Sequence, residues 1–168
     1  TTAKASALTV GSYSVVATDA NGCTTSESVT ITEPTALTSS IFSNNVICNG
    51  GTGDATITAS GGTGTITYLW NNGQTTAIAT GLTAGSYSVV ATDGNGCTTS
   101  ESVTITEPTV LNSTIASNNV LCNGGAGDAT ITASGGSGTI TYLWNDGQTT
   151  ETALSLVAGS YSVVATDA

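Results

Sequence analysis

The stretch "GDATITASGGTGTITYLW", residues 53–70, contains the pattern that decides the fold of this chain. In both halves apolar residues alternate with other residues, mostly threonine; the apolar ones are Ala55, Ile57 and Ala59, then Ile66, Tyr68 and Trp70. A period of two places one face of each strand in a core. Gly61-Gly62 separates the halves, and glycine permits the positive φ of a tight turn. The stretch therefore predicts two short, half-buried strands joined by a turn.

The residues around this stretch follow the same pattern. Further strands are expected at residues 37–48, 76–82, 87–92 and 102–106. Asn72-Gly73 and Asn95-Gly96 are turn signals between strands, because asparagine and glycine both tolerate positive φ. Short strands at this spacing, with Trp70 on the third of them, predict an immunoglobulin-like β-sandwich.

The chain repeats itself with a period of 74 residues. "TYLWN" at residues 67–71 returns at 141–145, and Cys23 returns as Cys97. A fixed period of this length is typical of tandem modules, each of which is one structural unit. The fold class predicted from the sequence is thus all-β, with tandem immunoglobulin-like β-sandwich modules.

Proline marks the boundary between repeats, at Glu33-Pro34 and at Glu107-Pro108. Proline cannot continue a strand ladder and restricts the residue before it, so it suits a short, stiff linker. If each repeat begins at such a Glu-Pro pair, residues 1–32 are the end of one repeat, residues 33–106 are a complete repeat, and residues 107–168 are a third repeat without its last strand. We expect the sequence to be a window on a longer array.

Composition excludes several classes of function. Of the 168 residues 7% are charged, only one is Lys or Arg, none is His, and the net charge is −10. Nucleic acids and anionic membranes bind proteins through Lys and Arg, so neither is an expected partner. No apolar run approaches the roughly 20 residues that span a bilayer. Without histidine, the usual general base and the commonest metal ligand are both missing. We expect no enzyme, no catalytic residue and no cofactor.

The four cysteines, Cys23, Cys48, Cys97 and Cys122, are candidates for disulfide bonds. One pair per repeat favours disulfides over zinc, which requires closely spaced Cys or His pairs. Pairing Cys48 with Cys97 within one repeat is the first expectation, and in the chain-entropy model it would stabilise the module by about 4 kcal/mol. In a standard sandwich, however, Cys48 and Cys97 would lie at opposite ends of the module, too far apart to bond. A staple from Cys48 to the turn cysteine of the next module, beyond residue 168, and free thiols remain alternatives.

Two segments of the complete repeat resemble the SprB-type repeats of bacterial gliding-motility adhesins. They are "CNGGTGDATITASGGTGTITYLWNNGQTT" from Cys48 and "LTAGSYSVVATDGNGCTTSESVTITEP" from Leu82. The matching landmarks are Cys48-Asn49-Gly50, Gly61-Gly62, Tyr68, Trp70, Gly73, Leu82, Ala84-Gly85, Tyr87, Asp93 and Gly96-Cys97. One departure is Thr65-Ile66, where the family usually has Pro-Tyr.

The resemblance implies a very large bacterial surface protein, exported by a dedicated secretion system and displayed as filaments. Such adhesins grip a substratum while the cell moves. No catalytic residue belongs to the repeat in this family.

The turns around Asp19, Asn21, Asp93 and Asn95 are candidates for calcium binding, since Asp-x-Asn-Gly resembles the opening of a calcium loop. The sequence has no bidentate glutamate at the right loop position. A hairpin turn with an aspartate at its base is the competing interpretation.

Other recurring residues receive structural interpretations. Glu27 and Glu101 recur with the array, which favours solvated strand positions over a pair of carboxylates that hydrolyses sugars. Tyr68 and Trp70 share a predicted core face, which favours packing over glycan binding.

These observations favour a structural or adhesive function, namely the repeat region of a large secreted filament at the cell surface. Its expected partners are neighbouring repeats, a second filament through lateral self-association, and a surface polysaccharide or substratum. The alternative is an array of glycan- or protein-binding modules without catalysis. Exposed aromatic side chains on one recurring face would support that alternative, and burial of Tyr68, Trp70 and Tyr87 would count against it.

Overall fold

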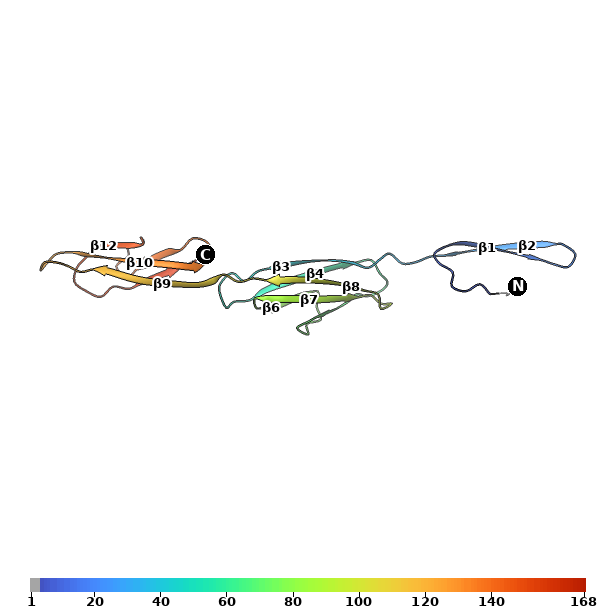
Figure 1. Cartoon of the computed structure of the whole chain (residues 1–168), viewed down its shortest axis with the longest axis horizontal. Helices are drawn as coiled ribbons and strands as arrows, with labels where there is room; N and C mark the ends of the chain where they lie inside the picture. Colours follow the sequence, from blue (N-terminus) through green and yellow to red (C-terminus); the bar gives the residue numbers. More distant parts are fainter. Residues whose placement is uncertain (1–3) are drawn as a thin grey trace.

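The computed structural model describes residues 4–168, and every regular element in that range is a β-strand. Thirteen strands form five small sheets, and these are grouped into three units that follow one another along an elongated molecule (Figure 1). None of the described residues forms a helix that could cross a membrane. We call residues 4–32, 33–106 and 107–168 the first, second and third modules. The predicted all-β fold of tandem sandwich modules is confirmed.

The second module is a sandwich of two three-stranded antiparallel sheets. One sheet has the order β3 (Thr38–Asn44), β4 (Gly53–Ser60), β6 (Ile78–Leu82), and the other has the order β5 (Thr67–Trp70), β7 (Gly85–Thr92), β8 (Thr98–Ile105). An immunoglobulin sandwich divides its strands between two sheets in a comparable way. This division supports the immunoglobulin-like assignment, which stays a prediction.

The core of the second module lies between these two sheets. Its largest fully buried side chains are Trp70, Ile57, Leu82, Ile105 and Val89. Trp70 is 1% exposed, and its indole Nε1 donates a hydrogen bond of 2.8 Å to the carbonyl oxygen of Thr76. Alternation along β4 and β5 thus predicted the inward face correctly.

The predicted turns are also present. Gly62, Gly73 and Gly96 have φ values of +66°, +87° and +86°, in the left-handed region that favours glycine. At Gly62 a side chain would also collide with its surroundings, because an added Cβ would lie 2.7 Å from a carboxylate oxygen of Asp93.

The strand predicted at residues 37–48 is shorter than expected. It ends at Asn44, and residues 45–52 form a loop. Here the chain leaves β4 and lies beside the end of β8: the Val46 amide donates to the Thr106 carbonyl oxygen (3.0 Å), and the Thr106 amide donates to the side-chain oxygen of Asn45 (3.0 Å). The strand therefore ends because residues 45 and 46 bond to Thr106 instead of to β4. A local sequence pattern does not predict such a long-range contact.

The third module repeats this arrangement over fewer strands. One sheet has the order β9 (Thr109–Asn118), β10 (Gly127–Gly136), β12 (Thr152–Leu156), and the other pairs β11 (Thr141–Trp144) with β13 (Val163–Thr166). Among residues 4–168, no strand lies beside β13 at the place that β8 occupies in the second module. The buried core is correspondingly smaller than that of the second module.

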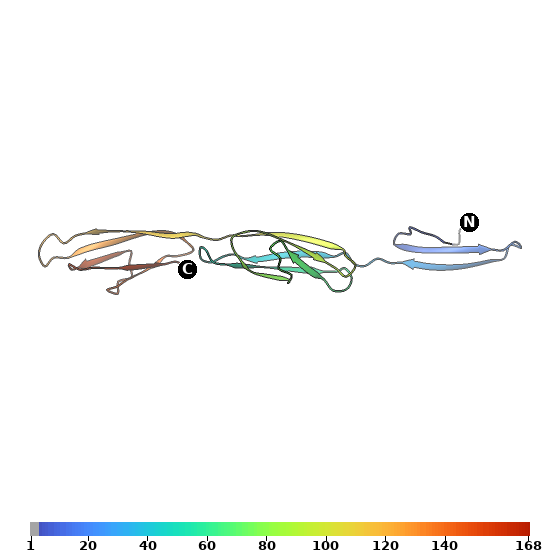
Figure 2. The ribbon, with the colours of Figure 1, turned by 90° about the horizontal axis from the view of Figure 1, so that it is seen from below.

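The first module consists of a single hairpin, β1 (Gly11–Thr18) and β2 (Thr24–Ile31). Figure 1 shows this hairpin edge-on as a single layer, and Figure 2 shows its two strands side by side after a quarter turn. Its strands have the same sequences as β7 and β8. Val15 is nevertheless 64% exposed, while its counterpart Val89 is 1% exposed, because only Val89 has a second sheet packed against it.

Candidate functional site

The cysteines were the most specific sequence feature, and all four are exposed and free in the described structure. Cys97 directly precedes β8, whereas Cys48 lies in the loop that contacts Thr106, just after the other end of β8. Eight extended residues span about 26 Å, and a disulfide requires Cα atoms less than about 7 Å apart. The expected pairing of Cys48 with Cys97 within one repeat is therefore wrong.

The loop that contains Cys48 forms the joint between the second and third modules. The amide of Gly50 donates to a carboxylate oxygen of Glu107 (2.8 Å), and the side-chain amide of Asn49 donates to the carbonyl oxygen of Pro108 (2.9 Å). Both bonds hold the linker between modules against the loop. The ribbon passes from one module to the next at this loop (Figures 1 and 2).

The third module contacts the same loop directly. The hydroxyl of Ser137 has one proton, and it lies within hydrogen-bond distance of two acceptors, the carbonyl oxygens of Ile47 (3.2 Å) and Ala168 (2.9 Å). The end of the described chain consequently lies beside the joint, as Figure 1 shows. A staple from Cys48 to the turn cysteine of the next module involves a position outside the 168 residues, so that expectation stays a prediction.

Asp93 organises the turn between β7 and β8 and is the one buried polar or charged side chain found among residues 4–168. One carboxylate oxygen accepts from the amide of Thr63 (2.8 Å), and the other accepts from the amides of Asn95 (3.0 Å) and Cys97 (2.8 Å). These bonds, that from Thr63 first, lower the pKa of Asp93 below its ordinary value of 3.8.

The exposed turn of the first module has the same local geometry. Asp19 accepts from the amides of Asn21 (2.9 Å) and Cys23 (2.8 Å). In both turns backbone N–H groups point at the carboxylate oxygen, where a bound cation would repel them. The described residues contain no group of three or more acidic, cysteine or histidine side chains placed to hold a metal. The geometry supports the hairpin-turn interpretation, and calcium binding stays untested.

The recurring glutamate Glu101 and the recurring aromatics have different partners. Glu101 accepts a hydrogen bond of 2.8 Å from the hydroxyl of Ser39, across the side of the sandwich where β8 meets β3. Trp70 is buried, and Tyr68 and Tyr87 pack against the core. Phe42, by contrast, is 66% exposed on β3. The sequence pattern did not indicate this exposed side chain, because no alternation of inward and outward residues was assigned to the strand predicted at residues 37–48.

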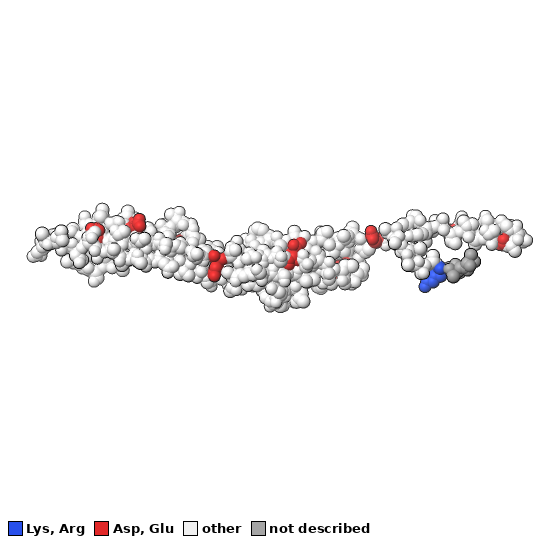
Figure 3. Space-filling view, in the orientation of Figure 1, with Lys and Arg blue, Asp and Glu red and all other residues white. Residues whose placement is uncertain are grey.

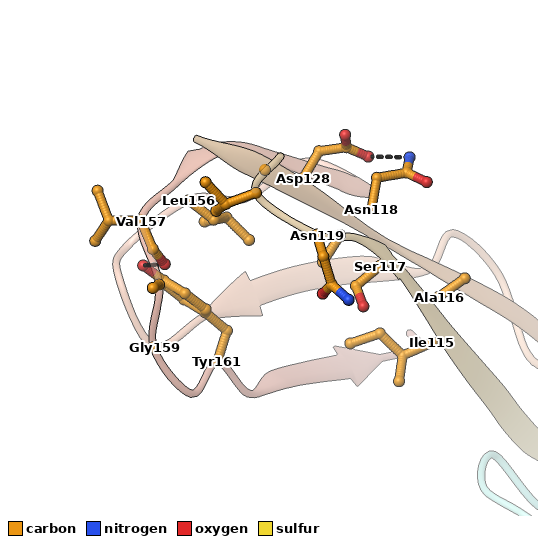
Figure 4. A pocket seen from close by; sticks show the side chains of 14 residues that line it. Ile115, Ala116, Ser117, Asn118, Asn119, Asp128, Leu156, Val157, Gly159 and Tyr161 are labelled. Carbon is orange, nitrogen blue, oxygen red and sulfur yellow. Dashed lines mark hydrogen bonds between the residues drawn. The ribbon is translucent and has the colours of Figure 1, made fainter. Parts of the chain in front are cut away.

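A groove of about 490 Å³ lies in the third module (Figure 4). Ile115, Asn119, Leu156 and Tyr161 are among the residues that line it. The corresponding place in the second module is covered by Ile105 of β8, a methyl group of which would lie 3.3 Å from a Cβ added at Gly53. The groove is thus the uncovered edge of a core.

The groove shows no constellation of catalytic side chains. Its one lining carboxylate, Asp128, accepts a hydrogen bond of 3.0 Å from Asn118, and both side chains lie at the rim in Figure 4.

Comparison with protein families gives two matches in the chain. Residues 40–75 and residues 114–149 each match the family model described as the SprB repeat. The second match begins 74 residues after the first, which is the period of the sequence. Both matched segments contain a strand with the buried tryptophan; the first also contains the loop of the joint, and the second contains the equivalent loop of the third module at residues 119–126. No curated protein matches the sequence.

Proposed function

Because the chain carries two SprB repeats, we propose that it is a force-transmitting region of a secreted adhesive filament, used in attachment or gliding. SprB repeats occur in cell-surface proteins, and the chain is a repeat region of that adhesin-like type. The proposed role is mechanical and involves no catalysis. Its modules set the reach of the filament, and each one resists opening under tension.

The observation that supports this proposal is the arrangement of the two ends of the second module. The strands that connect it to its neighbours, β3 and β8, lie side by side at the side of the sandwich and run in the same direction. Tension along the filament therefore shears one strand past the other. Contacts spread along both strands have to break together, including Ser39 with Glu101 and Val46 with Thr106.

Single-molecule pulling on the 168-residue chain tests the mechanical role. Opening of the second module releases 74 residues, which are about 25 nm long at full extension, so the added length is this value minus the end-to-end length of the folded module. We expect a distinct force peak with this step. The variant S39A/N45A removes one side-chain contact between β3 and β8 and one between the residues that directly follow them, and it should lower that force. The variant T58A on the outer face of β4 should leave the force unchanged. A step without a force peak would contradict the proposal.

Display at the cell surface is tested separately. An antibody raised against the second module should label intact cells of the source organism, and brief external protease should remove the label. Labelling that requires permeabilised cells would count against an extracellular filament.

The alternative function, an array of glycan- or protein-binding modules, has less support. Trp70 is buried, and Tyr68 and Tyr87 pack against the core, so these recurring aromatics do not form a binding face. The exposed Phe42 has Ala116 as its counterpart in the third module. A site built on Phe42 would therefore not recur with the array.

A further inference from the structure

We infer that the outer face of the β5–β7–β8 sheet binds the same face of a second copy of the chain, so that two filaments pair laterally. The inference rests on the proposed function, since it specifies a partner for the filament. In the second module the face comprises the outward residues of three strands: Thr67, Leu69, Asn71, Ser86, Ser88, Val90, Thr92, Thr98, Ser100, Ser102 and Thr104. We call this set the neutral face.

The neutral face carries no charged side chain, although the chain has a net charge of −10. The outer face of the opposite sheet carries Asp54, and its counterpart in the third module carries Asp128. Asp and Glu side chains form separated spots along the surface, with long uncharged stretches between them (Figure 3). Two acidic chains that approach through the neutral face avoid placing carboxylates opposite one another, which would be unfavourable.

The chemistry of the neutral face is complementary to itself. Eight of its residues are Ser or Thr, and a hydroxyl both donates and accepts hydrogen bonds, so two identical faces can satisfy each other. Near its centre Leu69 (59% exposed) and Val90 (40% exposed) lie directly opposite each other on β5 and β7. When a partner covers an apolar pair of this kind, the loss of contact with water lowers the free energy of the complex.

The neutral face recurs in the other modules. Leu143 and Val164 are paired on β11 and β13 of the third module and are 58% and 62% exposed. Val16, the counterpart of Val90 on the first hairpin, is 60% exposed. The outward positions of β1, β2, β11 and β13 are likewise uncharged. One filament thus presents several equivalent contacts.

The size of the face determines how many contacts are needed. Two strands of eight residues and one of four, about 4.8 Å apart with about 3.4 Å per residue, cover roughly 330 Å². A standard stable interface buries about 800 Å² on each partner. One module is therefore too small to hold a partner, and two or more in series should suffice through multivalency.

The same features favour a second copy over a neutral polysaccharide. Recognition of a sugar surface commonly uses exposed aromatic rings, and the neutral face has none: Tyr68 and Tyr87 on the same strands point toward the core. The second and third modules each have one such face, because the opposite sheet carries Asp54 or Asp128 outward. Pairing through like faces consequently stops at two filaments.

Analytical ultracentrifugation of the 168-residue chain at about 0.15 M salt tests the pairing. The unmodified chain should show a concentration-dependent monomer–dimer equilibrium. The variant S100E/S162E places one carboxylate on the neutral face of the second and third modules, and it should weaken dimerisation at least tenfold. The matched variant T58E/T132E adds the same charges to the opposite sheets and should change the dimerisation constant less than threefold.

Three results would overturn the inference. One is a chain that stays monomeric at all concentrations. Another is equal association in all three proteins, which would assign the contact elsewhere, such as to the groove of the third module. The third is binding of the monomer to insoluble neutral β-glucan that only S100E/S162E abolishes, which would make the partner a polysaccharide. None of these results changes the force peak that tests the mechanical role, so the two proposals fail independently.

Discussion

At the residue scale, the fold depends on a few polar side chains that satisfy backbone groups. Asp93 accepts three backbone hydrogen bonds, one of them from Thr63 in the turn between β4 and β5. It thereby ties together two turns at one end of the second module. Asp19 occupies the equivalent turn position in the first module, where Ala20 stands in place of Gly94, but none of residues 4–168 supplies the bond that Thr63 gives to Asp93. The same aspartate thus stabilises its own turn in both modules, and in the second module it also links that turn to a second one.

We predict that Asp93→Asn lowers the unfolding midpoint of the second module and that Asp19→Asn does not. The amide group of asparagine cannot accept the bonds of both carboxylate oxygens, so a buried N–H is left without an acceptor. Thermal unfolding followed by Trp70 fluorescence in a Trp144→Phe background measures the effect. Equal midpoints for the unmodified chain and Asp93→Asn would show that the turn contributes no stability.

The same residue predicts a dependence on pH. Hydrogen bonding lowers the folded-state pKa of Asp93 below 3.8, so its stabilising contribution is complete above the unfolded pKa and is lost as pH falls through the folded pKa. Stability of the unmodified chain should fall from about pH 4 downward, and the Asp93→Asn variant should show a shallower fall. Urea unfolding at a series of pH values checks this expectation.

We also predict that the four cysteines of the 168-residue chain stay reactive when it is folded and incubated with a low-molecular-weight disulfide. Each thiol should form a mixed disulfide with the reagent by exchange, releasing the other half as a thiol. No peptide linking Cys48 to Cys97 should form, because the length of β8 separates them. Mass spectrometry of a non-reduced digest would detect such a peptide, and its presence in folded monomer would contradict the structure.

At the element scale, identical strands have different environments in different modules. The sequences of β7 and β8 recur in β1 and β2, yet only the former cover a core. An isolated two-stranded hairpin is marginally stable in water, whereas strands packed on a second sheet are held by apolar burial. The alternating pattern therefore specifies which face is to be buried, and the partner sheet determines whether it is buried.

The short strand β5 provides the sharpest test of this packing. Trp70→Ala should destabilise the second module by about 3–5 kcal/mol, the usual cost of removing a large buried aromatic, which is enough to unfold a marginal domain. Leu69→Ala, one position along the same strand but 59% exposed, should cost well under half as much. Chemical denaturation followed by circular dichroism distinguishes the two. Equal costs would mean that β5 does not present these faces as described.

At the scale of the whole molecule, the joint determines the shape. The loop of residues 45–52 holds the linker through Glu107 and the third module through Ser137. The linker at Glu33 lacks such a loop partner among the described residues, because the first module consists only of its hairpin. Both linkers contain Thr-Glu-Pro-Thr, but among residues 4–168 only the second one is hydrogen-bonded to a loop of the preceding module.

We predict that Glu107→Gln loosens the joint and that Glu33→Gln does not. The substitution replaces a charge-assisted hydrogen bond from the Gly50 amide with a weaker neutral one. Small-angle X-ray scattering should show a shorter maximum dimension and a broader distance distribution for Glu107→Gln alone. Indistinguishable curves for Glu107→Gln and the unmodified chain would show that the linker is stiff without this bond.

The sequence by itself determined the all-β class, the 74-residue period, the turns at glycine and the inward faces of β4 and β5. These features depend on residues close together in the chain, so alternation and turn chemistry are sufficient to predict them. Only the tertiary structure decided the position of the loop at residues 45–52, the separation of Cys48 from Cys97 and the bonds of the joint. Those depend on strand order, which places residues about 60 positions apart side by side. No local pattern specifies which ends of a sandwich meet, because the decisive free energy comes from packing two sheets together.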